Sequence, residues 1–202
     1  MRTVFDELLS GVQSFLAGFD EQAAQSFVAS IDWSMPAREL VPRGLPCLVH
    51  LDRAAEIAGE EGRALVAQLR DHAGRFRWGQ TYTSADFGQK FIDNYGWLEV
   101  FGTRGHFAND GVAGGFLVLG PGIEYPDHHH MAEELYIPLT AGTEWRMGDQ
   151  PWRRRAAGEV IHHDSNVSHA MRTGDEPLLA FYLWRGGPLA ARSTVTGTTG
   201  QA

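Results

Sequence analysis

The sequence has very little of the residues that would cross-link the chain or attract a polyanion. Cys47 is the only cysteine among 202 residues, so no intrachain disulfide can form. It lies in the apolar stretch LPCLVH, and we interpret it as a core residue rather than a nucleophile. Lys90 is the only lysine and the formal net charge is −8 at pH 7. That balance argues against a nucleic-acid partner, because nucleic-acid-binding proteins usually present a basic face.

A long uninterrupted apolar run is also missing. The N-terminal segment MRTVFDELLSGVQSFLAGFD is apolar but carries Asp6 and Glu7, so it predicts neither a signal peptide nor a membrane span. We therefore expect a cytoplasmic protein without a membrane partner. The length and the 43% hydrophobic content predict one globular domain with a full core.

The first half of the chain has helical patterns. Apolar residues recur at helical spacing after a possible capping box formed by Thr3 and Asp6. Further helices are predicted over 21–31, over 51–76 with breaks at Gly59 and Gly62, and over 84–95 with Thr83 or Ser84 as cap. Residues 36–48 contain three prolines and predict a connector. We expect residues 1–95 to form a helical extension.

From about Trp97 the pattern changes to short apolar runs separated by Gly, Pro and Asp turns. Regularly spaced short strands of this kind predict a mainly β structure, either a sandwich or a barrel. We place the barrel at residues 96–187, with the helices packed on it, and expect residues 188–202 to be a flexible tail. The runs that predict strands are WLEVFG, GGFLVLG, LYIPLTAGTEWRM, GEVIHH and LLAFYLWRG.

A histidine cluster interrupts this β-rich half. The stretch YPDHHHMAEELY covers residues 125–136. In a strand, alternate residues face the same side, so His128 and His130 point together, as do Glu134 and Tyr136. Neutral imidazoles with a carboxylate suit a divalent transition metal such as Fe, Mn, Zn, Co or Ni. A second cluster, GEVIHHDSNVSH, offers His162, His163 or His169 as a fourth ligand, and the spacing alone does not choose among them.

Both clusters resemble motifs of the cupin superfamily. The arrangement Gly122-x5-His128-x-His130-x3-Glu134 is similar to the first cupin motif, with Gly142 one residue later than the usual closing glycine. The resemblance of the second cluster implies that His169 is the fourth ligand and that His162 and His163 are not ligands. It implies a double-stranded β-helix with the metal inside the barrel. The residues that carry the second motif are Gly158 and His169, while Asp164, Asn166 and Thr173 replace its proline, second glycine and asparagine.

A narrower resemblance concerns the tyrosines. The pattern Tyr125-x4-His130-x3-Glu134-x-Tyr136, together with HAMRTGDEPLLAFYLWRG, is similar to bacterial cupin-type lyases that cleave dimethylsulfoniopropionate (DMSP). This resemblance is strongest over residues 78–187. It implies a reaction that produces dimethyl sulfide and acrylate, with DMSP as the small-molecule partner. A homodimer is possible, although no sequence motif indicates one.

The chemistry of such an elimination suggests roles for the aromatic residues. Tyr136 is the preferred base for the α-proton, and Tyr125 is an alternate base or a donor to the carboxylate, because a nearby divalent metal favours a phenolate. Aromatic faces bind a sulfonium with about 0.5–2 kcal/mol each. We prefer the segment from Trp78 to Tyr82 as a lid, and we expect Trp78, Tyr82 and Trp184 to bind substrate. The wider set of candidates for the sulfonium wall adds Phe107, Phe116, Trp145 and Tyr182.

Two other functions fit the same metal motif. An Fe(II) dioxygenase acting on a small organic acid would require oxygen for turnover. A non-catalytic cupin would bind a small molecule without forming product.

Overall fold

The first helix begins where the sequence predicts its cap. The computed structural model describes residues 3–196, and in it α1 spans Val4–Leu16. The backbone N–H of Asp6 donates to the Thr3 hydroxyl at 3.2 Å, and that of Thr3 donates to the Asp6 carboxylate at 2.8 Å. The predicted capping box is therefore confirmed. The helix buries Leu8, Val12, Phe15 and Leu16, as its periodicity indicates.

The other helices are short and separated by glycines or prolines. The predicted break within residues 51–76 is confirmed, since α3 ends before Gly59 and α4 begins after Gly62. A Cβ added to Gly59 would lie 2.7 Å from Ala157 Cβ, and one on Gly62 would lie 2.8 Å from a Leu139 methyl. These glycines therefore allow the turn to approach the barrel closely. The bounds are α2 Gln22–Ala29, η1 Pro46–His50, α3 Leu51–Ile57, α4 Arg63–His72, η2 Ala73–Arg75 and α5 Ser84–Asn94.

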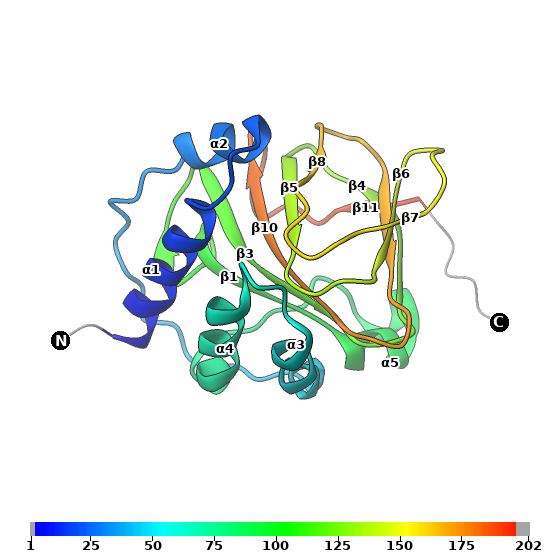
Figure 1. The fold of residues 1–202 in the computed structure, drawn as a ribbon, viewed down its shortest axis with the longest axis horizontal. Helices are drawn as coiled ribbons and strands as arrows, with labels where there is room; N and C mark the ends of the chain where they lie inside the picture. Colours follow the sequence, from blue (N-terminus) through cyan, green and yellow to red (C-terminus); the bar gives the residue numbers. More distant parts are fainter. Residues whose placement is uncertain (1–2, 197–202) are drawn as a thin grey trace.

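The change from helices to strands falls between α5 and β1, and the strands form two sheets (Figure 1). The six-stranded sheet has the order β2-β1-β3-β10-β5-β8, and the five-stranded sheet has the order β11-β4-β9-β6-β7. All pairs are antiparallel except β1 with β2. The two sheets face each other as a jelly-roll barrel, which is the cupin fold. The strands are β1 Tyr95–Gly102, β2 Phe107–Ala108, β3 Val112–Leu119, β4 Glu124–His129, β5 Glu133–Pro138, β6 Glu144–Met147, β7 Arg153–Arg154, β8 Ile161–His163, β9 His169–Arg172, β10 Leu178–Arg185 and β11 Thr194–Val195.

The six-stranded sheet is buried on both faces, and its side chains alternate between them. We call the side covered by the helices the outer face and the side that lines the barrel the inner face. On β10, Leu179, Phe181 and Leu183 belong to the same core cluster as the helices, whereas Ala180 and Tyr182 belong to the barrel cluster. In Figure 1, α1, α3 and α4 lie against the strands on one side and the five-stranded sheet lies on the other. Because successive side chains of a strand point to opposite faces, β10 places its packing residues on the outer face and its barrel-lining residues on the inner face.

Two predictions about the β-rich half are wrong in part. The run LYIPLTAGTEWRM is not one strand, because β5 and β6 belong to different sheets. The segment from residue 188 was expected to be flexible, yet Thr194 pairs with His129 and Val195 with His128 as β11 on β4. Leu189 and Ser193 are buried as well. The remaining residues of the predicted tail, 197–202, lie outside the described residues.

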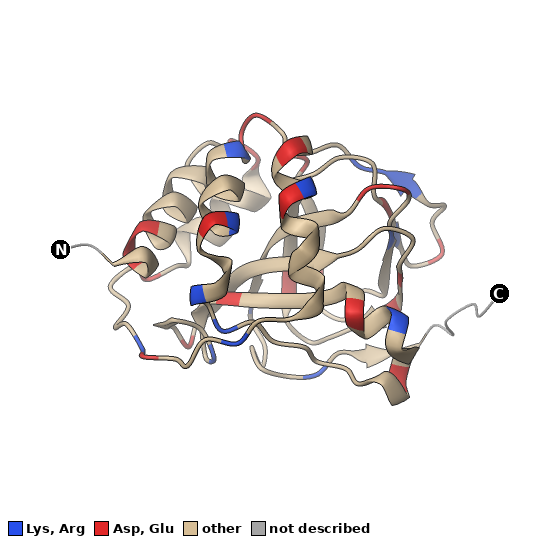
Figure 2. Cartoon of the chain, turned by 90° about the horizontal axis from the view of Figure 1, so that it is seen from below, with Lys and Arg blue, Asp and Glu red and all other residues tan. Residues whose placement is uncertain are grey.

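Charged residues on the surface mostly pair with each other. In the view from below (Figure 2), acidic and basic residues lie beside each other on the helices. Arg53 of α3 contacts Glu56 at 2.8 Å and Glu176 in the turn before β10 at 2.5 Å. These exposed pairs contribute little to stability but orient α3 on the barrel. None of the helices within residues 3–196 is long and apolar enough to cross a membrane. The cytoplasmic location and the homodimer stay predictions.

Candidate metal centre and its pocket

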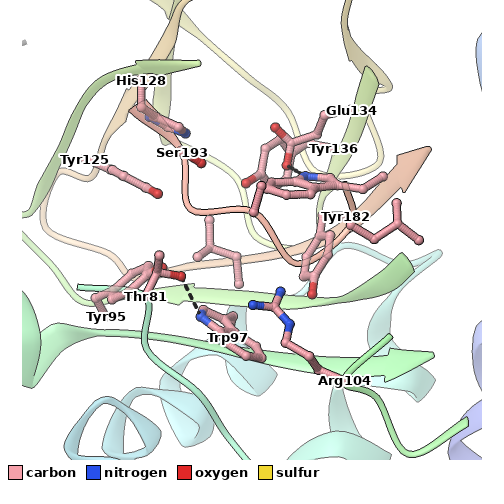
Figure 3. A pocket seen from close by; sticks show the side chains of 14 residues that line it. Thr81, Tyr95, Trp97, Arg104, Tyr125, His128, Glu134, Tyr136, Tyr182 and Ser193 are labelled. Atoms are coloured by element: carbon pink, nitrogen blue, oxygen red, sulfur yellow. Dashed lines mark hydrogen bonds between the residues drawn. The ribbon is translucent and has the colours of Figure 1, made fainter. Parts of the chain in front are cut away.

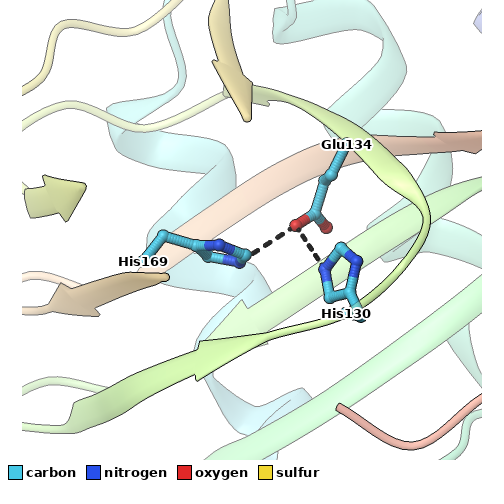
Figure 4. Close-up of side chains that lie close together, drawn as sticks. All are labelled: His130, Glu134 and His169. Carbon is cyan, nitrogen blue, oxygen red and sulfur yellow. Dashed lines mark hydrogen bonds and ion pairs between the residues drawn. The ribbon is translucent and has the colours of Figure 1, made fainter. Parts of the chain in front are cut away.

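Three of the four predicted metal ligands meet inside the barrel. Glu134 on β5 lies between His130, which follows β4, and His169 on β9 (Figure 4). One carboxylate oxygen, Oε2 of Glu134, is 3.0 Å from His130 Nε2 and 3.1 Å from His169 Nε2. All three side chains are buried, and their ligand atoms lie within 4.8 Å of one another. Residues from two sheets thus converge on one point.

The orientation of the imidazoles suits a cation. His130 Nδ1 lies 2.8 Å from the Ala132 carbonyl, and His169 Nδ1 lies 2.9 Å from the Val167 carbonyl. A carbonyl can only accept, so each Nδ1 carries the proton and each Nε2 presents a lone pair to Glu134. An Nε2 lone pair and a carboxylate oxygen repel each other unless a cation, either a proton on the imidazole or a metal ion, lies between them. The donor set of two imidazoles and a carboxylate therefore fits a divalent transition metal.

Glu134 and the imidazoles around it also shift each other's pKa. Burial lowers the pKa of His130, but the Glu134 carboxylate outweighs it and the net pKa is raised. Burial pushes the pKa of Glu134 upward, and the surrounding imidazoles hold it well below its usual range instead. The carboxylate is thus ionised and attracts a positive charge into the cluster.

His128 lies beside this three-residue group. Its Nδ1 is 2.8 Å from the Pro126 carbonyl, the same arrangement that the other two imidazoles show. Its ring is 4.2 Å from the His169 ring but 6.4 Å from the His130 ring, and it stacks on Tyr125 at 4.0 Å. Burial holds the pKa of His128 well below its usual range, so the imidazole is neutral and can act as a ligand. Its role as a fourth ligand stays a prediction.

The remaining two histidines of the second cluster, His162 and His163, are successive residues of β8 and therefore point to opposite faces of the sheet. His162 points out of the barrel and its Nε2 lies 2.6 Å from Glu133. His163 points inward, stacks on the His169 ring at 4.1 Å, and has its Nδ1 3.9 Å from Glu134 Oε2. His163 therefore supports the ring of His169 rather than joining the group of three.

The two predicted catalytic tyrosines lie next to the metal ligands. Tyr136 shares the inner face of β5 with Glu134 and lines the pocket. Burial, followed by the negative charge of Glu134, raises the pKa of Tyr136 well above its usual range. Burial likewise raises the pKa of Tyr125, whose hydroxyl is 2.8 Å from that of Tyr82. Without a metal ion, both hydroxyls are therefore protonated at neutral pH.

The pocket opens between the metal ligands and a wall of aromatic rings (Figure 3). Trp184, which was predicted to contact substrate, lines it and donates its indole N–H to Glu134 Oε1. Tyr182, on the same strand, lies on the inner face opposite Tyr136 in register. The side chains that line the pocket come from the segment before β1, from the barrel strands and from the segment after β10, and they are Thr81, Tyr95, Trp97, Arg104, Leu117, Tyr125, His128, Glu134, Tyr136, Tyr182, Trp184, Leu189, Ala191 and Ser193.

The prediction that Trp78 lies at this pocket is wrong. Its ring is fully buried in the core beneath the helices, and its indole N–H donates to the Ala73 carbonyl at 3.0 Å. Tyr82 does not line the pocket and instead supports Tyr125 from behind. Of the preferred lid, only Thr81 faces the pocket. Among the wider candidates, Phe107 and Phe116 belong to the outer-face core, and Trp145 packs on Tyr136 at 5.0 Å.

Several residues that line the pocket were not predicted from the sequence. Tyr95 and Trp97 stand at the start of the first strand, where alternation with the apolar Leu98 could have placed them on the inner face. Leu189, Ala191 and Ser193 come from the segment that the sequence predicts to be a flexible tail. Arg104 lies in the turn after β1, and no local pattern places it at the pocket.

Comparison with known proteins shows similarity to lyases of DMSP. The family model for DMSP lyases matches residues 20–180. The chain is 31% identical over 182 residues to the DMSP lyase DddQ of Ruegeria pomeroyi, covering 90% of this chain and 89% of the other. It is 30% identical over 149 residues to the putative DMSP lyase DddL of Cereibacter sphaeroides, covering 72% of this chain and 61% of the relative.

Two solved structures share the whole architecture, including the helices. The crystal structure of the Ruegeria pomeroyi lyase DddQ superposes with a TM-score of 0.88 at 29% identity, over 98% of each chain. A structure from a study of the DMSP lyases RdDddP and RnDddQII gives a TM-score of 0.87 at 26% identity, over 96% of this chain and 97% of the other.

Proposed function

The chain belongs to the DMSP lyase family, and on that premise we propose that it cleaves DMSP into dimethyl sulfide and acrylate with the help of one divalent transition metal ion. The reaction removes a proton from the α-carbon, forms a double bond between the α- and β-carbons, and breaks the bond from the β-carbon to sulfur. The electron pair of that bond stays on sulfur, so the positively charged sulfonium leaves as neutral dimethyl sulfide. The abstracted proton stays on the base.

The observation that carries this proposal is the convergence of Glu134 with the Nε2 atoms of His130 and His169 at the end of a pocket that also contains Tyr136. These three residues would hold the metal, with His128 as the predicted fourth ligand. A divalent cation there would polarise the substrate carboxylate, stabilise negative charge at the α-carbon and favour a phenolate nearby.

The residues of the chain then have separate tasks. Tyr136, two residues beyond Glu134 and on the same face, takes the α-proton. Tyr125, anchored by Tyr82, contributes a hydroxyl from the opposite side of the pocket (Figure 3). The rings of Tyr95 and Trp184 contact the sulfonium and exclude water from it.

Headspace gas chromatography on the purified chain tests this proposal. Protein stripped with a chelator should release no dimethyl sulfide from DMSP, and reloading with Mn, Fe, Co, Ni or Zn should restore release without oxygen. Tyr136→Phe should lower kcat by about 10²–10⁴-fold, the usual contribution of general-base catalysis, while its metal content stays the same. Tyr182→Phe, the same change on the residue opposite in register, should lower kcat far less.

Two results would contradict the proposal. If no metal restores dimethyl sulfide release, the chain is not a DMSP lyase. If release requires oxygen, the metal site performs dioxygenase chemistry instead.

A further inference from the structure

Arg104 is a charged residue of the pocket that the proposed reaction leaves without a task. Among the Lys and Arg residues of positions 3–196, it is the only one that lines the pocket. In Figure 3 its guanidinium points into the pocket beside Trp97 and Tyr182, while Tyr125 and Tyr95 lie on the other side. A positive charge inside a pocket for a zwitterion must affect which end of the zwitterion lies where.

The guanidinium is held in place by a buried carboxylate. Glu99, whose side chain is only 1% exposed, accepts from Arg104 Nε at 3.2 Å and lies 3.1 Å from Nη2. The backbone N–H of Arg104 also donates to Glu99 at 2.5 Å. The guanidinium carbon lies 4.5 Å from the centre of the Trp97 ring, and Trp97 is itself tied to Thr81 by a hydrogen bond of 3.0 Å.

This arrangement leaves part of the guanidinium available. Glu99 engages Nε and Nη2, and within the described part of the chain no residue accepts a hydrogen bond from Arg104 Nη1. The side chain is 38% exposed, lines the pocket and directs its guanidinium into it (Figure 3). A guanidinium whose rotamer is already fixed loses little entropy when it binds an anion, and its planar N–H groups match a carboxylate.

We propose that Arg104 recognises the carboxylate of the substrate and thereby determines the orientation of the zwitterion in the pocket. The inference rests on the proposed function, since it assumes a substrate with a carboxylate at one end and a sulfonium at the other. A carboxylate has two oxygens, so contact with Arg104 leaves one for a metal ion. The same positive charge repels the sulfonium, which is left to the aromatic rings away from Arg104. Arg104 is thus a specificity-determining residue.

The competing explanation is that Arg104 only neutralises Glu99 and supports Trp97. Arg104→Gln alone leaves a buried carboxylate unpaired and can destabilise the fold. The double variant Glu99→Gln/Arg104→Gln removes both charges, keeps the shape of the side chain at position 99 and shortens the one at position 104. Arg75→Gln, at an exposed arginine outside the pocket, is the matched control. Arg104→Lys keeps the charge without the planar pair of donors.

Two probes separate the ends of the substrate. Propionate carries the carboxylate without the sulfonium, and trimethylsulfonium carries the sulfonium without the carboxylate. Their dissociation constants are measured by calorimetry on metal-loaded protein, and KM and kcat for DMSP are measured alongside. We expect propionate to bind at least about tenfold more weakly to both Gln variants, as for other hydrogen bonds to charged groups, and to the Lys variant with an intermediate constant. Trimethylsulfonium should bind the double variant within about twofold of the parent chain, and KM should rise more than kcat falls.

Other outcomes overturn the proposal. Unchanged propionate affinity in the double variant would mean that the carboxylate does not contact Arg104. Equal weakening of both probes would mean that the pair only supports the pocket wall. Calorimetry needs no turnover, so failure of this inference remains distinct from failure of the lyase proposal, which would appear as a parent chain that releases no dimethyl sulfide.

Discussion

The two faces of the six-stranded sheet use the same strands for different purposes. On β5 the outer face carries Leu135 and Ile137, which pack under the helices, and the inner face carries Glu134 and Tyr136. On β10 the outer face carries aliphatic residues and phenylalanine, and the inner face carries tyrosine and tryptophan. Packing alone requires only apolar volume. Chemistry requires polar atoms, and burying them costs free energy unless a hydrogen-bond partner or a metal ion satisfies them. Substitutions on the inner face should therefore reduce metal binding and activity, whereas substitutions of neighbouring residues on the outer face should reduce stability.

The largest effect is expected at the inner face. Glu134→Gln keeps the shape of the side chain but removes the negative charge that holds the imidazoles and the metal. Metal affinity should fall by more than the roughly 10–100-fold typical of losing a mere supporting contact, and dimethyl sulfide release should disappear with it. Metal content by mass spectrometry and headspace chromatography measure both. A variant that keeps its metal and its activity would remove Glu134 from the ligand set.

The adjacent residue should show the opposite behaviour. Leu135→Ala on the outer face opens a cavity in a fully buried position, and such changes typically cost about 2–5 kcal/mol in the free energy of unfolding. Denaturant titration measures this loss. Below the unfolding transition, kcat and metal content should match those of the parent chain. A large loss of kcat in folded protein would show that the two faces are coupled.

A smaller effect is expected from Trp184→Phe. The change keeps an aromatic ring but removes the indole N–H that donates to Glu134. Supporting contacts of this kind are worth about 10–100-fold in metal affinity, so the metal dissociation constant should rise within that range while the unfolding free energy changes little. Competition with a chromogenic chelator measures it. Trp97→Phe is the matched control for this variant. The indole N–H of Trp97 donates to Thr81 instead of Glu134, so its loss should leave the metal affinity unchanged.

The smallest effect concerns a histidine far from the metal. His106 is buried against Phe5 and Phe76, and burial lowers its pKa from 6.5 to about 4. Between those two values the unfolded chain binds more protons than the folded chain, so the His106 contribution to stability is lost as the pH falls from 6.5 towards 4. His106→Gln should flatten the fall in unfolding free energy over this window, with a difference of about 1–2 kcal/mol near pH 5.

Thermal or denaturant unfolding across pH 4–7 measures this difference. kcat at neutral pH should be the same for His106→Gln and the parent chain, because His106 is neutral there in both states and lies among the outer-face residues. An unchanged pH slope would mean that His106 is already protonated or exposed in the folded chain.

Several features of this protein follow from the sequence by itself. The capping box of α1, the breaks at Gly59 and Gly62, the start of the barrel and the inward side of Glu134 and Tyr136 all depend on residues within a few positions of one another. Local backbone geometry decides such features, because helical and strand periods are properties of short segments. The resemblance to the cupin motifs, and not the spacing alone, predicted that His169 joins His130 and Glu134, and in the structure their ligand atoms lie within 4.8 Å of one another.

The tertiary structure alone decided which other residues complete the pocket. Trp78 turned into the helical core because its backbone pairs with Arg43. The segment after β10 became a wall because Thr194 and Val195 found the free edge of β4. Arg104 came to the pocket because a buried Glu99 holds it against Trp97. The first two placements depend on contacts between segments far apart in the sequence, and the third depends on the burial of Glu99 in the folded chain. A pattern of local periodicity contains no information about them.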